Sequence, residues 1–170
     1  MPKKKRNYKA EAWRGQVGQF GAECVLISPL RRAVETATLA FDGVEVPFEL
    51  CRSARELWWS EQQNTLGTPE ALAEVLRALP RGVDVVGLEE AFSASPDDPQ
   101  TEEASIQLLR RVIGSRGEDC LAVVCHWGVI NALCGSSAPN AAIIDCRRFP
   151  KSGHLQVVKH HDPPAANGAK

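Results

Sequence analysis

Two adjacent arginines stand where a strand-like run gives way to a helix-like one. The segment LISPLRRAVETA (26–37) has an apolar run that ends at Ser28, and Arg31 and Arg32 then fall in the first turn of the expected helix. Free N–H groups at a helix N-terminus attract anions, and the planar guanidinium group suits phosphate or carboxylate. Taken alone, the arginines fit a solvated surface better. As part of an anion site, Arg32 is the stronger candidate, and Arg31 either assists it or pairs with Glu35.

A second apolar run, LAVVCH (121–126), ends abruptly at His126 and is followed by a small-residue turn. A lone histidine at a strand end is more often structural than functional, but this context favours a ligand-facing role. Trp127 either covers the edge of the core or forms a wall of the site. Glu56, in AREL (54–57), is a third candidate, and its simpler explanation is a surface salt bridge of little energetic value.

The elements that must position these residues follow from hydrophobic periodicity. Continuous apolar runs predict buried strands, and apolar residues at helical spacing predict helices between them, with Ser28 in the N-cap place and Pro29 in the first turn of the first such helix. Alternation of the two predicts an α/β domain with a mainly parallel sheet and flanking helices. We expect strands at 24–28, 44–50, 121–126, 141–146 and 155–159, and helices at 29–41, 68–79, 102–115 and 128–135.

The 170 residues fit one domain, which we place at residues 22–159, after a basic, flexible start (1–21) and before a disordered tail (160–170). A net charge of −1 gives no global reason to expect nucleic acid or an anionic membrane as a partner. No apolar run approaches the ~20 residues of a membrane span. Oligomeric state stays open.

The six cysteines form no C-x-x-C pair, so a zinc site has weak support, and we expect all six to be reduced. No apolar signal segment follows the basic N-terminus. These two observations predict a cytoplasmic protein. The run Lys3, Lys4, Lys5 and Arg6 is either a nuclear import signal or, as short basic runs more often are, a solvated start of the chain.

Together these segments resemble the histidine phosphatase superfamily, also called phosphoglycerate mutase-like. SPLRRAVETA (28–37) is similar to that family's Ser-Pro-Leu-x-Arg-Ala-x-x-Thr-Ala stretch, nearly residue for residue. LAVVCHWGVI (121–130) is similar to its late strand, which ends in the second histidine of the site. ARELWW (54–59) falls where the family has its Arg-Glu loop. The resemblance covers about residues 22–146 and implies a phosphoglycerate mutase-like fold.

The resemblance also implies roles for the candidates. Arg32 would clamp the phosphoryl group, with Ser28 and Arg31 beside it, and His126 would donate hydrogen bonds to its oxygens. Glu56 would give a proton to the leaving alcohol. These roles agree with phosphoryl transfer, which depends mainly on positioning and on stabilising charge. The family needs no metal and no cofactor, and its ligands are phosphorylated small molecules or phosphoproteins.

One departure from the family is large. The family opens with a strand, central in its sheet, that ends in Arg-His-Gly and carries the nucleophilic histidine. Here no histidine precedes the Ser-Pro-Leu motif, and the chain has only His126, His154, His160 and His161. We therefore expect an N-terminally truncated form of the fold that is inactive as it stands. The alternatives are a pseudoenzyme that binds a phosphorylated ligand in a regulatory role, and, least favoured, substitution by a remaining histidine.

Overall fold

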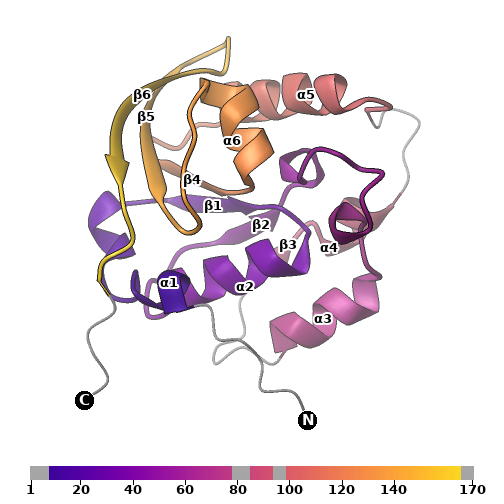
Figure 1. Cartoon of the computed structure of the whole chain (residues 1–170), viewed down its shortest axis with the longest axis horizontal. Helices are drawn as coiled ribbons and strands as arrows, with labels where there is room; N and C mark the ends of the chain where they lie inside the picture. Colours follow the sequence, from indigo (N-terminus) through magenta and orange to yellow (C-terminus); the bar gives the residue numbers. More distant parts are fainter. Residues whose placement is uncertain (1–7, 78–84, 94–98, 166–170) are drawn as a thin grey trace.

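A parallel sheet forms the centre of the computed structural model, which describes residues 8–77, 85–93 and 99–165 (Figure 1). Its order is β3-β2-β1-β4, and each neighbouring pair runs parallel. The α/β architecture with a mainly parallel sheet, expected from the sequence, is confirmed. The strands are β1 (Cys24–Ile27), β2 (Phe48–Leu50), β3 (Val85–Val86) and β4 (Leu121–Val124).

Helices cover both faces of this sheet (Figure 1). On one face lie α1 (Tyr8–Glu11), α2 (Arg31–Ala40) and α3 (Pro69–Arg77), and on the other lie α5 (Glu102–Ser115) and α6 (Trp127–Cys134). The short helix α4 (Leu88–Phe92) follows β3, and 3₁₀ turns span Val17–Phe20, Arg52–Ala54 and Gln62–Asn64. None of the described helices combines the length and the apolar character that crossing a bilayer requires.

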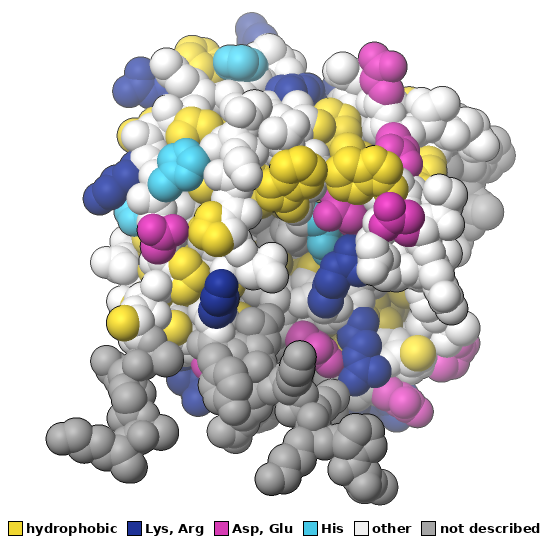
Figure 2. Space-filling model, viewed as in Figure 1, with side chains coloured by type: hydrophobic (Ala, Val, Ile, Leu, Met, Phe, Trp, Pro, Cys, Tyr) yellow, Lys and Arg dark blue, Asp and Glu magenta, His cyan; other side chains and the backbone are white. Residues whose placement is uncertain are grey.

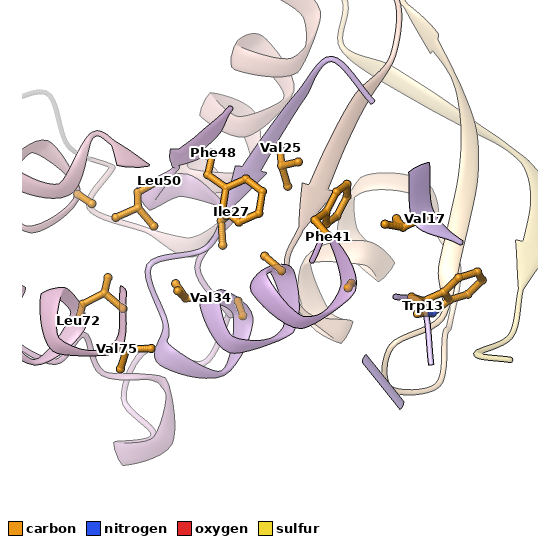
Figure 3. Close-up of a cluster of buried hydrophobic side chains, with 14 residues drawn as sticks. Trp13, Val17, Val25, Ile27, Val34, Phe41, Phe48, Leu50, Leu72 and Val75 are labelled. Atoms are coloured by element: carbon orange, nitrogen blue, oxygen red, sulfur yellow. The ribbon is translucent and has the colours of Figure 1, made fainter. Parts of the chain in front are cut away.

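The core divides into two clusters because successive side chains of β1 point to opposite faces. Val25 and Ile27 pack with Phe48 of β2 and Val34 of α2, as Figure 3 shows. Cys24 and Leu26 pack instead against side chains of α5 and α6. All four residues of β1 are buried, which explains why this strand reads as a continuous apolar run in the sequence.

The chain ends its fold in an antiparallel hairpin of β5 (Ile143–Phe149) and β6 (His154–His161). Among the described residues these two strands pair only with each other. Their turn lies against α5, where the N–H of Lys151 donates a hydrogen bond to the carbonyl of Gly114 at 3.4 Å. Gly153 in this turn has φ +64°, and a Cβ there would lie 1.8 Å from the carbonyl oxygen of Arg110.

The N-terminal segment is more ordered than the sequence led us to expect. Residues 8–21, assigned above to a flexible start, contain α1 and a 3₁₀ turn, and Trp13 and Val17 are buried in the core. The indole N–H of Trp13 also donates to the carbonyl of Ala141 at 2.6 Å. Burial of these side chains against α2 is the reason for the order. The basic run from Lys3 to Arg6 lies outside the described residues.

The other end of the chain needs a similar correction. His160 and His161, assigned above to a disordered tail, are the last residues of β6. The ring of His161 packs edge-on against Phe20, with centroids 5.0 Å apart, so the N-terminal turn and the hairpin support each other. Residues 166–170 lie outside the described part of the chain.

The strand β1 lies inside the sheet and not at its edge. β1 pairs directly with β2 on one side and with β4 on the other, over Cys24–Ile27 and Leu121–Val124. Within the described residues, β4 has a ladder partner on one side only. The four strands therefore form a continuous sheet that ends at β4.

The close packing of the hairpin turn against α5 can be tested with two glycine variants. Gly43→Ala and Gly153→Ala both place a side chain at positive φ, but a Cβ at Gly43 meets nothing within 4 Å. We expect Gly43→Ala to cost about 1 kcal/mol of unfolding free energy. Gly153→Ala should cost at least about 3 kcal/mol, because the clash with the Arg110 carbonyl adds to the backbone strain. Urea unfolding of both variants measures the difference, and equal losses would contradict this packing.

Candidate active site

The carboxyl ends of β1 and β4 meet because the two strands pair in parallel. Ser28 follows β1, and its N–H donates to the carbonyl of Val124 at 2.9 Å. His126 follows β4, and its Nε2 lies 2.7 Å from the Ser28 hydroxyl oxygen. Both side chains are buried. The two apolar runs that end in candidate residues thus bring Ser28 and His126 into direct contact.

Ser28 is not the N-cap that the sequence suggested. The helix α2 begins at Arg31, and its N-cap is Leu30, which keeps an extended conformation with ψ 131°. The Ser28 oxygen instead accepts the N–H of Leu30 at 3.3 Å. That hydroxyl keeps its own proton and a second lone pair, so it can pair with Nε2 of His126 in either histidine tautomer.

Arg32 and Arg31 take different directions from the first turn of α2. The guanidinium group of Arg32 donates to the carbonyl of Gln63 at 2.6 Å and to the side-chain oxygen of Asn64 at 2.7 Å. Arg31 forms an ion pair with Glu35 at 2.9 Å, the surface alternative considered above, and its side chain is 59% exposed. Arg32 is therefore held in a fixed orientation by the loop at Gln63 and Asn64, whereas Arg31 is a surface residue.

Glu56 is buried beside the start of α6. Its carboxylate accepts the N–H of Leu57 at 3.0 Å. Burial raises the pKa of Glu56, and the N–H groups of Leu57, Gly128 and Val129 together with the charge of Arg32 only partly oppose that rise. Burial is therefore the main cause of the raised pKa. A carboxyl group with a raised pKa suits a proton donor.

The pKa of His126 moves the other way, to about 3, mainly because burial disfavours the charged ring and secondly because Arg32 is positive. His126 is therefore neutral at physiological pH. The charge of Arg32 acts on both His126 and Glu56, so these groups lie within electrostatic reach of one another. Figure 2 shows a hollow on this face in which a histidine lies between acidic and basic side chains, beside adjoining hydrophobic ones.

Asn64 is the residue of this site that the sequence did not reveal. It is only 2% exposed. Its amide nitrogen donates to the carbonyls of Leu57 at 2.9 Å and Trp58 at 3.3 Å, while its oxygen accepts from Arg32. Asn64 thus ties the arginine to the loop that carries Glu56. No local pattern marks it, because Arg32 lies 32 residues away along the chain.

Two tryptophans adjoin these residues. The rings of Trp58 and Trp127 stack with centroids 6.0 Å apart and an interplanar angle of 16°. Trp127, for which the sequence left two roles open, is 49% exposed. A Cβ on Gly128 would lie 2.7 Å from both the Glu56 carboxylate and the Trp58 ring. Glycine at this position therefore allows the acid and the indole to pack together on the start of α6.

Other parts of the described chain offer less chemistry. No three side chains of histidine, cysteine, aspartate or glutamate gather there as metal ligands would. All six cysteines are free, and burial raises the pKa of Cys125 to about 12, so that thiol stays protonated. An open depression at the start of α5 is lined by none of the candidate residues; its walls are Thr101, Glu103, Ala104, Gln107 and Arg111.

Comparison with known families agrees with this geometry. The family model of the histidine phosphatase superfamily (branch 1) matches residues 7–160, so the chain belongs to this superfamily. A search of curated proteins found no significant match. The resemblance drawn from the sequence motifs is therefore confirmed.

The role of Asn64 as the tie between Arg32 and the loop of Glu56 can be tested by deletion of its side chain. We expect Asn64→Ala to lower the unfolding free energy by about 2 kcal/mol, because two backbone carbonyls and a guanidinium group lose their partner. The neighbouring Gln63→Ala, which removes an exposed side chain, should cost less than about 0.5 kcal/mol. Urea unfolding measures both, and an Asn64 variant as stable as the Gln63 variant would refute the tie.

Proposed function

We propose that this chain binds the phosphoryl group of a phosphate monoester between Arg32, His126 and Ser28, with Glu56 beside the ester oxygen. The observation that carries the proposal is the guanidinium group of Arg32, which Gln63 and Asn64 hold within electrostatic reach of a buried, neutral histidine. A fixed guanidinium group provides charge and paired donors for phosphate oxygens. Membership of the histidine phosphatase superfamily supports a phosphoryl group as the ligand.

Each residue has a distinct task in this proposal. Arg32 supplies the positive charge, and His126 donates a hydrogen bond to a phosphate oxygen through its Nδ1–H. Glu56, whose pKa is raised by burial, gives its proton to the ester oxygen as the P–O bond breaks. In that step the phosphoryl group passes to a nucleophile, and the site is therefore suited to hydrolysis or transfer of a phosphoryl group once a nucleophile is present.

We further propose that the chain as it stands binds its ligand without turning it over. The sequence has no Arg-His-Gly segment. The remaining histidines, His154, His160 and His161, all belong to β6, and their contacts are with residues outside the site: Phe149, Ser136 and Phe20. The alternative function is a phosphate-binding module with a regulatory role. In that case the same four residues bind the ligand but do not catalyse a reaction.

Phosphate binding can be measured through stability. For a dissociation constant near 1 mM, 10 mM phosphate adds about 1.4 kcal/mol, or roughly 3 °C in Tm. We expect this shift in the unchanged chain and in Arg31→Ala, whose side chain pairs with Glu35, and its loss in Arg32→Ala. Thermal unfolding at matched ionic strength gives the shift within each variant. The same absence of a shift in all three proteins would argue against a phosphate site.

Turnover is tested separately from binding. With p-nitrophenyl phosphate as substrate, we expect the purified chain to release no more product than the double variant Arg32→Ala, His126→Ala, because the sequence has no Arg-His-Gly segment to supply the family's nucleophile. Clear activity that the double change abolishes would show that a nucleophile is present after all. Binding without activity would favour the regulatory module over the enzyme.

A further inference from the structure

The two exposed tryptophans form a feature that phosphate binding alone does not explain. Trp58 is 45% exposed and Trp127 is 49% exposed, while Trp13 is buried in the core. Single exposed apolar side chains are common, but two adjoining indoles that face solvent together form a patch that ordinarily serves recognition. These two meet beside Glu56 and His126, the residues of the proposed site.

Both rings are held in place rather than left free. The indole N–H of Trp127 donates to the hydroxyl of Ser137 at 2.9 Å. The backbone of Trp58 has φ +55°, a left-handed conformation that a non-glycine residue adopts at a cost. Its carbonyl accepts hydrogen bonds from Glu61 at 3.0 Å and Asn64 at 3.3 Å, which keep that conformation. Strain that surrounding bonds maintain is typical of functional sites.

The position of the rings relates them to one part of the ligand. The Trp58 ring and the Glu56 carboxylate converge on the same point above Gly128, where a Cβ would be 2.7 Å from each. In the proposed function Glu56 faces the ester oxygen. The group attached to that oxygen must therefore lie against Trp58 and Trp127, while Arg32 holds the phosphate.

The geometry of the pair favours a planar partner. The rings are nearly parallel and 6.0 Å apart between centroids, whereas a third ring between them would need a separation of about 7 Å. A ligand ring can thus stack only on an outer face or edge of the pair.

Building on the proposed function, we infer that the ligand is an aryl phosphate monoester, whose aromatic group stacks on Trp58 and Trp127 while its phosphate lies at Arg32. The two indoles therefore select ligands with an aromatic group, and Arg32 binds the phosphate of any such ligand. This division of tasks separates the two proposals experimentally, because each set of residues affects a different ligand.

The test compares phenyl phosphate, glycerol 3-phosphate and inorganic phosphate by titration calorimetry of the whole chain. We expect phenyl phosphate to bind about 3- to 10-fold more tightly than glycerol 3-phosphate. Trp58→Leu and Trp127→Leu should each remove this preference and leave the affinity for inorganic phosphate within about twofold. Trp127→Phe, which keeps a ring, should retain part of it. Phe149→Leu, at an aromatic that is 40% exposed and packs on His154, is the matched control and should change nothing.

The outcomes are distinct. Equal affinities for phenyl phosphate and glycerol 3-phosphate, with inorganic phosphate still bound, would overturn the aryl preference and leave the phosphate site intact. Failure of all three ligands to bind would overturn the proposed function and this inference with it. A neutral phosphotyrosine peptide that binds more tightly than phenyl phosphate would assign the aryl group to a protein side chain, and one that binds less tightly would assign it to a small ester.

Discussion

The hydrogen bond between Ser28 and His126 joins the two strand ends on which the candidate site depends. At 2.7 Å and buried, it fixes the residue that follows β1 against the N-cap residue of α6. The parallel pairing of β1 and β4 makes the contact possible, since it brings both carboxyl ends to the same edge of the sheet. The helices α2 and α6 start from these ends. Arg32 lies in the first turn of α2, and Glu56 packs against the start of α6. Movement of one strand end relative to the other would break the buried hydrogen bond between Ser28 and His126.

Burial, more than charge pairing, sets the electrostatic character of the site. The positive charge of Arg32 lowers the pKa of Glu56 and of His126 alike, yet Glu56 has a raised pKa because its desolvation is the larger effect. Burial therefore favours the neutral form of both groups, and Arg32 is the cation that acts on them. A site of this kind attracts an anion through one oriented guanidinium group and receives its oxygens with neutral donors.

The sequence predicted a helix or strand correctly where the hydrophobic pattern lies within that single element. The continuous apolar runs at β1 and β4 and the amphipathic spacing of α5 predicted these elements and their order correctly. Contacts between distant segments were beyond such patterns. Asn64 has its partner in α2, and its environment in the sequence is an ordinary polar loop.

The expectations of a flexible N-terminus and a disordered C-terminal tail failed for the same reason. The sequence contained one indication of order at the N-terminus. Trp13, Val17 and Phe20 recur at intervals of four and three residues, which is the spacing of one helical face, although glycine and glutamine residues surround them. His161 lies against Phe20, so the order of each end depends on the other. Because the two partners are separated by most of the chain, each end read by itself resembles a flexible tail.

The outer edge of β4 gives the two strands of the site unequal protection. Within the described residues β1 has ladder partners on both sides and β4 on one, and the residues of β4 are only half-buried. Amide protons of β1 exchange with solvent only when the sheet opens, whereas those on the outer side of β4 have no ladder partner among the described strands. We therefore expect faster hydrogen exchange in β4, which leads to His126, than in β1, which leads to Arg32.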